Sequence, residues 1–206
     1  MKTAIIGLGN MGRGLARRLA GRTNLVLASR NEADAAGLAA TLGVEWLAIA
    51  EAIAVADIII LGLPYSAALG FVSDAKIDGK ILVDISNPLK EDFSGLTIGH
   101  DTSAGEEIQK RADGAEVVKA FNTIFAEIFD APRQATANVP VFVAGNTAKA
   151  VEAVEQLVIT AGFAVENAGA LDAARLLEPV GMLNIRLGYG LGRGTAIAPA
   201  WLKIAA

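Results

Sequence analysis

Short apolar runs alternate with segments of helical periodicity along almost the whole chain. The most apolar run covers residues 58–63, has the length of a strand, and ends at Pro64. Between such runs, apolar side chains return at the spacing of a helix face, as Leu15 and Leu19 do. This alternation is typical of βαβ units joined into a parallel sheet. We therefore expect an α/β fold of the Rossmann type, with a doubly wound and mostly parallel sheet.

The same pattern predicts the individual elements. Strands are expected at residues 3–6, 24–28, 44–46, 57–63, 80–85, 116–120, 139–144 and 163–166, and helices at 11–20, 32–42, 49–55, 66–74, 103–112, 147–161 and 171–187. Residues 89–101 show little pattern and are expected to form a loop. We expect one structural unit, made of a Rossmann domain over 1–170 and a small C-terminal helical extension over 171–206 packed on it.

A glycine-rich turn follows the first expected strand. In its G-x-G-x-x-G pattern, Gly7 permits the tight turn, Gly9 lets the backbone approach a pyrophosphate, and Gly12 lets the helix pack closely on the strand. The N-terminus of that helix adds free N–H groups and the positive end of a dipole. The sequence therefore predicts a dinucleotide site, whose residues here are Gly7, Leu8, Gly9, Asn10, Met11 and Gly12.

The end of the second strand indicates which dinucleotide is bound. An acid at this position would hold the adenosine ribose of NAD, but the chain reads Ser29-Arg30-Asn31 there. A hydroxyl and a guanidinium suit a 2′-phosphate, and the nearest acids, Glu32 and Asp34, fall in the first turn of the next helix. We predict that Ser29, Arg30 and Asn31 favour NADP(H). The alternative is a solvated Arg30 and NAD as the cofactor.

Three more segments follow strands and are expected at the carboxyl edge of the sheet, where ligands of such folds bind. They are residues 62–65, 84–88 and 119–123. For each, the alternative is a turn whose polar side chains only cap the backbone. The residues predicted to contact the nicotinamide half are Leu63, Pro64, Tyr65, Ala120 and Asn122, and the candidates for the hydride-transfer cleft are Phe121, Asn122 and Thr123.

Isolated polar residues predict little chemistry. His100 is the only histidine and falls in the unpatterned loop, where a surface role is expected. Tyr65 and Tyr189 are interpreted as packing or rim residues. Lys119 is a candidate general acid, although a lysine at a strand end usually keeps its ammonium in solvent. We predict no metal site and assign no catalytic residue.

Composition narrows the class of protein. The net charge of −4 argues against nucleic-acid binding, and the absence of cysteine excludes disulfides and thiolate sites. No apolar stretch is long enough for a membrane span. The absence of cysteine fits a reducing compartment and the N-terminus lacks the pattern of a signal peptide, so a cytoplasmic protein is expected. Apolar residues make up 53% and charged residues 19% of the chain. A chain this apolar would expose patches that need cover, which predicts a homodimer.

Several segments together resemble one family, the NADP-dependent reductases of the deazaflavin coenzyme F420, in its bacterial branch. The resembling segments are Gly7–Leu19, Ala28–Arg30, Leu63–Pro64, Val118–Thr123, Val143–Asn146 and Ala173–Pro179. The resemblance implies a dimeric oxidoreductase that passes hydride between NADP(H) and coenzyme F420, a small-molecule electron acceptor. It also implies that Ser29 and Arg30 bind the 2′-phosphate, that Leu63 and Pro64 flank the nicotinamide, and that residues 121–123 line the cleft.

Other readings share the cofactor site and differ in the cleft. The chain could reduce a flavin, a quinone, or a small imine or carbonyl compound, or it could be a non-catalytic NADP(H) sensor. A 3-hydroxyacid dehydrogenase also begins with this glycine motif, but it needs a large helical second domain. About 40 residues follow the last expected strand, which is too few for such a domain.

Overall fold

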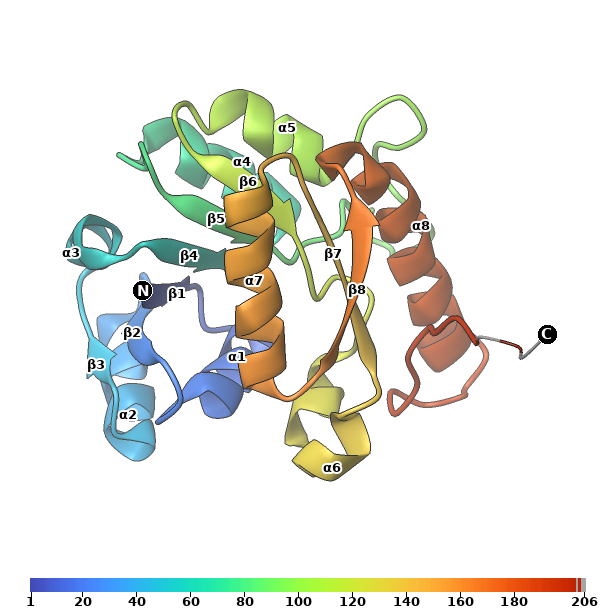
Figure 1. Ribbon diagram of the computed structural model, residues 1–206, viewed down its shortest axis with the longest axis horizontal. Coiled ribbons are helices and arrows are strands. Elements are labelled where there is room, and N and C mark those ends of the chain that lie inside the picture. The colour runs from blue at the N-terminus through green and yellow to red at the C-terminus, as the bar shows by residue number, and fades with distance from the viewer. Residues whose placement is uncertain (203, 205–206) are drawn as a thin grey trace.

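The computed structural model describes residues 1–202 and 204 (Figure 1). Its centre is an eight-stranded sheet in the order β3-β2-β1-β4-β5-β6-β7-β8. The strands are β1 (Lys2–Ile6), β2 (Asn24–Ala28), β3 (Glu45–Trp46), β4 (Ile58–Leu61), β5 (Ile81–Asp84), β6 (Glu116–Lys119), β7 (Pro140–Gly145) and β8 (Ala164–Gly169). All neighbours pair in parallel except β6 and β7, which pair antiparallel, so β7 and β8 run against the other six. The predicted α/β, mostly parallel sheet is confirmed.

Helices cover both faces of this sheet (Figure 1). The α-helices are α1 (Asn10–Leu19), α2 (Glu32–Leu42), α3 (Ile49–Val55), α4 (Tyr65–Asp74), α5 (Ala104–Arg111), α6 (Arg133–Thr136), α7 (Ala148–Ala161) and α8 (Ala174–Ile185). Buried side chains of α1, α2 and α7 form one core, and those of α3, α4 and α5 form a second. Alternate residues of the strands divide between the two, as Ile5 and Ala4 do. The doubly wound architecture follows from this two-sided burial.

Local sequence signals fix several helix ends. Asn31 caps α2 by accepting the backbone N–H of Asp34, and Ser103 caps α5 by accepting that of Glu106. Gly43, after α2, has a φ of 65°, a left-handed conformation that glycine adopts without steric cost. These residue types are the ones that favour the ends of helices.

The segment between β6 and β7 contains elements that the pattern does not predict. A 3-10 helix, η1 (Ala126–Asp130), and the one-turn α6 lie here. Both are too short to show periodicity, and a buried arginine of α1 organises them. The guanidinium of Arg18 donates to the carbonyl oxygens of Phe129 at 2.7 Å and Ala131 at 2.7 Å. Tertiary contacts therefore decide the structure of this segment.

The predicted helix 171–187 is three consecutive helical segments, of which α8 is the central one. The 3-10 helix η2 (Leu171–Ala173) precedes it, and the π-helix η3 (Arg186–Gly190) follows it. Leu177 of α8 packs on Phe142 and Ala144 of β7. The division at residues 170 and 171 stays a prediction, and residues 203, 205 and 206 of the extension lie outside the described part. No described helix has the length and apolar character needed to cross a membrane.

Candidate functional site

The turn between β1 and α1 has the geometry that binding of a pyrophosphate requires. Gly7 has a φ of 95°, and a Cβ there would overlap the carbonyl of Gly62. A Cβ on Gly12 would overlap the carbonyl oxygen of Gly7, which is why the helix can approach the strand so closely. At Gly9, by contrast, a Cβ would meet no atom within 4 Å. Two glycines are therefore needed for packing, whereas Gly9 faces open space that a phosphate could fill.

The rest of the turn divides into exposed and buried positions. Gly9 is the N-cap of α1 and has no side chain to accept from the first amides of the helix, so these stay available to a ligand. Asn10 is exposed and Met11 is half-buried, and both line the cavities described below. The side chain of Leu8 lies in the core, so this residue can offer a ligand only its backbone.

The predicted 2′-phosphate residues lie on the surface after β2. Arg30 is exposed, and none of the described carboxylates forms an ion pair with it. The hydroxyl of Ser29 accepts the N–H of Asn31 at 3.3 Å, and the Asn31 side chain is occupied as the cap of α2. Beside them, Arg13 of α1 forms an ion pair with Asp34 of α2, at 2.6 Å to Oδ2. Sequence reasoning missed Arg13.

Two adjoining cavities open at the carboxyl edge of the sheet. The first, which we call the turn cavity, has a volume of about 730 Å³ and is mostly apolar. It runs from the glycine turn past Leu63, Pro64 and Tyr65 to the loop that contains Phe93. Three of the residues predicted to flank the nicotinamide therefore lie together on one wall. Burial, followed by the nearby Glu107 charge, raises the pKa of the Tyr65 hydroxyl, so this residue stays neutral.

The second cavity, of about 230 Å³, is lined by amide side chains and is called the amide cavity. It shares the residues Asn10, Met11, Ile85 and Asn87 with the turn cavity, so the two meet along one wall. Its other lining residues are Asn122–Glu127, Gly181, Asn184, Ile185 and Tyr189. The geometry thus brings Asn122, predicted from the sequence, beside the α8 residue Asn184, which sequence reasoning missed.

Asn122 and Thr123 line the amide cavity, and each of them holds one buried polar atom without a partner among the described residues. The side-chain amide of Asn122 donates to Asn87 Oδ1 at 2.9 Å and to the carbonyl of Leu177 at 3.0 Å. Within the described part of the chain, Asn122 Oδ1 and Thr123 Oγ1 are buried without a hydrogen-bond partner. Buried polar atoms are rarely left unpaired, and a bound ligand is one explanation.

Phe121 and Ala120 do not line either cavity, so their predicted side-chain contacts with ligand are corrected here. Both are fully buried in the core, and the ring of Phe121 lies 6.2 Å from that of Phe129 and 6.3 Å from that of Phe163. Phe121 nevertheless has a φ of 60°, a strained value for a bulky residue. Its anchored ring holds this left-handed turn, after which Asn122 and Thr123 lie in the amide cavity.

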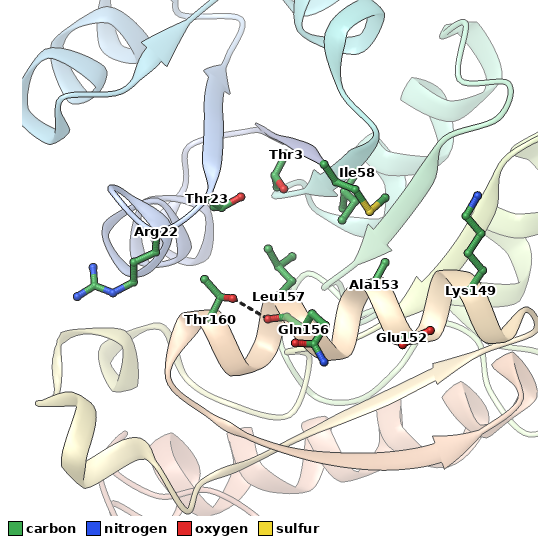
Figure 2. Close-up of a pocket in the computed structure, with 11 residues that line it drawn as sticks. Thr3, Arg22, Thr23, Ile58, Lys149, Glu152, Ala153, Gln156, Leu157 and Thr160 are labelled. Atoms are coloured by element: carbon green, nitrogen blue, oxygen red, sulfur yellow. Dashed lines mark hydrogen bonds between the residues drawn. The ribbon is translucent and has the colours of Figure 1, made fainter.

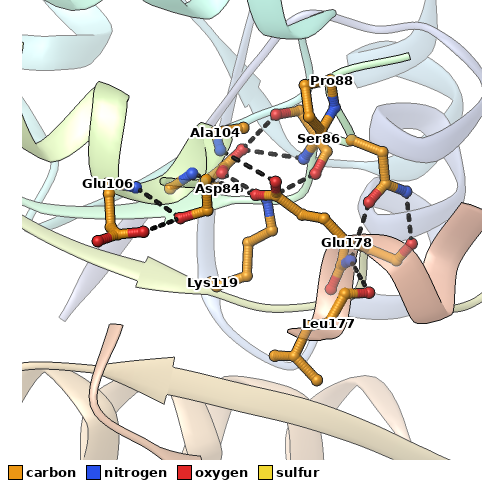
Figure 3. A network of polar contacts seen from close by, with 12 residues as sticks. Asp84, Ser86, Pro88, Ala104, Glu106, Lys119, Leu177 and Glu178 are labelled. Carbon is orange, nitrogen blue, oxygen red and sulfur yellow. Dashed lines mark hydrogen bonds and ion pairs between the residues drawn. The ribbon is translucent and has the colours of Figure 1, made fainter. Parts of the chain in front are cut away.

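Lys119 is buried in a polar network (Figure 3). The expectation that its ammonium stays in solvent is wrong. Its ammonium donates to Asp84 Oδ2 at 2.8 Å, to Glu178 Oε1 at 2.7 Å and to the carbonyl of Ser86 at 2.7 Å. Glu178 also accepts the backbone N–H groups of Ala104 and Gly105 at the start of α5. The network therefore joins β5, β6, α5 and α8, and it reaches the turn cavity through Ser86.

The charge states of this network follow from its partners. Burial alone would lower the pKa of Lys119, but the carboxylates of Asp84 and Glu178 outweigh burial and raise it. Burial raises the pKa of Glu178, although the Lys119 ammonium opposes that shift. Lys119 is thus held as a cation with its three donors occupied, which leaves it unsuited to act as the general acid considered from the sequence.

A further hollow, of about 440 Å³, lies at the opposite edge of the sheet (Figure 2). Thr3 and Ile58, at the amino ends of β1 and β4, line it together with α7 residues such as Lys149 and Glu152. Ligands of open parallel sheets bind at the carboxyl ends instead. His100 also lies away from the two cavities, exposed in the loop, with a φ of 62°.

Comparison with known proteins relates the chain to one family of oxidoreductases. Residues 2–88 match the family described as NADP oxidoreductase, coenzyme F420-dependent. The chain is 30% identical to the F420-dependent NADP reductase of Methanocaldococcus jannaschii, over 99% of this chain and 100% of that protein. It is also 32% identical to Metalloreductase STEAP3 of Rattus norvegicus over 87% of its length, although the match spans only 36% of that longer protein.

A solved structure agrees over the full length. This structure is of a protein from Arthrobacter sp. FB24 that is named as a candidate F420-dependent NADP reductase. It superposes on this chain with a TM-score of 0.84 at 29% identity, and the match covers 100% of both chains. The family resemblance inferred from the glycine turn and the later segments is therefore confirmed. The chain belongs to the family of coenzyme F420-dependent NADP oxidoreductases, and is an NADP-dependent oxidoreductase.

Proposed function

We propose that this oxidoreductase transfers hydride between NADP(H) and a deazaflavin of the coenzyme F420 type. The observation that carries the proposal is the pair of adjoining cavities, which meet over the glycine turn at the carboxyl edge of the sheet. The shared lining residues leave room for two flat rings to approach each other where the two spaces adjoin. The family membership and the name of the relative from M. jannaschii support the deazaflavin as the acceptor.

The residues of the glycine turn would hold the dinucleotide. The open space at Gly9 and the free amides of α1 suit the pyrophosphate, and Ser29 and Arg30 suit the 2′-phosphate. Asn31 would act indirectly, because its side chain caps α2 and its backbone N–H donates to the hydroxyl of Ser29. A bound nicotinamide would supply or accept the hydride. The protein contributes orientation and exclusion of water rather than an acid or a base.

Leu63 and Pro64 would flank the nicotinamide, while Tyr65 borders the same cavity. Their apolar surfaces exclude water from the hydride. In the amide cavity, Asn122 Oδ1 and Thr123 Oγ1 would accept N–H groups of a ring or carboxamide, which would satisfy two buried acceptors. Orienting both rings in this way contributes up to about 7–11 kcal/mol in model reactions.

The direct test follows the absorbance of oxidised deazaflavin after mixing with protein and NADPH, with free flavin as a parallel acceptor. We expect saturable reduction of the deazaflavin and slower reduction of the flavin. Tight NADPH binding without deazaflavin reduction would overturn the choice of acceptor. It would favour a flavin, quinone, imine or carbonyl substrate, a metal ion as the name of the rat relative suggests, or a sensor role.

Substitution of Thr123 by Val tests the cleft itself. Because Thr123 Oγ1 has no described partner, Thr123→Val should leave the melting temperature unchanged and lower kcat/KM for the acceptor about tenfold. Thr160→Val, at the opposite edge of the sheet, serves as the control and should leave kcat/KM unchanged. Unchanged turnover of Thr123→Val would remove this hydroxyl from the cleft.

We also propose that the protein is a cytoplasmic homodimer. Large apolar side chains are exposed on α8 and the residues that follow it, among them Leu176 at 71%, Leu183 at 54% and Leu191 at 61%. A second copy would cover this surface. Light scattering should give a mass near twice 21.2 kDa. A mass near 21.2 kDa would refute the dimer.

A further inference from the structure

The ion pair between Arg13 and Asp34 lies between the two helix N-termini that frame the proposed cofactor site. Arg13 directly follows Gly12 in the first turn of α1, where the pyrophosphate is proposed to bind. Asp34 lies in the first turn of α2, three residues after Asn31. The Arg13 guanidinium reaches both carboxylate oxygens of Asp34, and the two side chains are about one-third exposed, at 36% and 33%. The pair therefore bridges the space between the pyrophosphate turn and the 2′-phosphate residues.

A carboxylate in this place should oppose binding of NADP(H). A 2′-phosphate carries a charge near −2, and an acid beside the adenosine ribose favours the 2′-hydroxyl of NAD(H) instead. The backbone N–H of Asp34 donates to the capping side chain of Asn31, so the first turn of α2 is tied to the segment that holds Arg30. The backbone of Asp34 therefore cannot move away from the site without breaking this cap.

We propose that Arg13 determines cofactor choice by neutralising Asp34. This inference rests on the proposed NADP(H) site. With the ion pair formed, Asp34 adds little net charge, and the exposed Arg30 provides the attraction for the 2′-phosphate. Without Arg13, the free carboxylate repels the 2′-phosphate and becomes available to accept the 2′-hydroxyl of NAD(H). Arg13 is thus a specificity-determining residue that acts through Asp34.

The test is a double-mutant cycle with NADPH and NADH titrated into the wild type, Arg13→Gln, Asp34→Asn and the double variant. Arg13→Gln should weaken the binding of NADPH about tenfold and leave the binding of NADH unchanged or tighter. Only NADPH carries a 2′-phosphate that the freed carboxylate would repel. Asp34→Asn alone should leave NADPH as tight or tighter. The double variant should recover NADPH affinity to within about threefold of the wild type.

A matched ion pair serves as the control. Arg17, one turn further along α1, pairs with Asp130 at 2.7 Å, and both side chains are exposed. Arg17→Gln and Arg17→Gln/Asp130→Asn should leave the ratio of NADPH to NADH affinity unchanged. A similar loss of that ratio in the control would mean that any charge on α1 has the same effect, and would overturn the inference.

Three outcomes separate the inference from the proposed function. If Arg13→Gln weakened the binding of NADPH and NADH equally, Arg13 would be assigned to the pyrophosphate. That result would refute its role in the choice between the two cofactors. Weak NADPH binding that Asp34→Asn fails to restore would mean that Arg13 contacts the 2′-phosphate directly, which also refutes neutralisation. A wild type that binds neither nucleotide would refute the proposed cofactor site itself, and the inference with it.

Discussion

At the scale of single residues, the three glycines of the turn carry different constraints. Gly7 and Gly12 are required because a Cβ on either would overlap backbone atoms, so their identity concerns folding. Gly9 faces open space, so its identity concerns the ligand. The sequence motif predicts all three positions, because the constraint is local to a strand-turn-helix unit. Only the structure separates the packing glycines from the binding glycine.

Gly9→Ala and Gly12→Ala should therefore affect different properties, the first NADPH binding and the second stability. Gly9→Ala should leave the melting temperature within about 2 °C of the wild type and weaken NADPH binding about tenfold, because a methyl group takes space beside the phosphates. Gly12→Ala should destabilise the fold by about 3 kcal/mol or more, because the methyl group meets the carbonyl of Gly7. Thermal denaturation and NADPH titration measure both. Tight NADPH binding by Gly9→Ala would contradict the assignment.

The charges of the buried network can be separated in the same way. Lys119→Met leaves Asp84 and Glu178 as two uncompensated buried carboxylates and should cost about 3–5 kcal/mol. Glu178→Gln leaves a neutral pair of Lys119 and Asp84 and should cost less. Denaturant unfolding measures both free energies. A larger loss from Glu178→Gln would contradict this account of the charges.

The stability difference between the wild type and Glu178→Gln should depend on pH. The pKa of Glu178 is raised in the folded state above its ordinary 4.5, so folding favours its protonated form. The contribution of Glu178 to the free energy of unfolding is largest below pH 4.5. It falls as the pH rises through the raised pKa of the folded state. Glu178→Gln should lack this fall, whereas Glu152→Gln, an exposed control on α7, should keep it. Parallel pH curves for the wild type and Glu178→Gln would refute the raised pKa.

At the scale of elements, α8 forms one wall of the amide cavity by close approach. A Cβ on Gly181 would lie 2.8 Å from the carbonyl oxygen of Asn122 and 2.8 Å from Asn87 Nδ2. The helical pattern predicts a helix over residues 171–187, which contains α8. It does not predict which face of α8 meets which loop, because that contact joins residues far apart in the chain. Asn184 and Gly181 were missed for this reason.

Gly181→Ala should displace α8 from the cleft. The added methyl group should cost about 1–3 kcal/mol and lower turnover more than it weakens NADPH binding, because the dinucleotide turn lies on a different element. Gly190→Ala is the matched control, since among the described residues a Cβ there would meet only a flexible side-chain atom of Arg186, at 3.7 Å. Equal turnover in the two variants would argue against a role of α8 in forming the cleft.

At the scale of the whole molecule, the sheet can be predicted from the sequence, but the polar residues that are buried around it can be predicted only in part. Apolar strands buried on both faces are visible as runs such as 58–61, so the fold class and the carboxyl edge follow from the sequence. The buried Lys119 was misjudged, because its two partners, Asp84 and Glu178, lie 35 and 59 residues away along the chain. Lysine burial depends on such distant partners, which no local pattern reveals.

Binding of the cofactor should stabilise the molecule as a whole. At an NADPH concentration 100 times its Kd, linkage adds about 2.7 kcal/mol to the free energy of unfolding. For a chain of 206 residues, this raises the melting temperature by about 5–10 °C. Differential scanning fluorimetry measures the shift, and Gly9→Ala at the same NADPH concentration should show less of it. No shift with saturating NADPH would contradict preferential binding to the native state.

The contact between Lys119 and Glu178 has a consequence for the order in which the protein matures. Glu178 follows β5, β6 and α5 in the chain, and it completes a network whose other members belong to β5, β6 and the start of α5. During synthesis, the Rossmann strands leave the ribosome before α8 does, so Lys119 and Asp84 must wait for their last partner. Such closure of distant segments is slow compared with the formation of local helices. The amide cavity, one wall of which α8 provides, is therefore complete only after α8 has docked on the sheet.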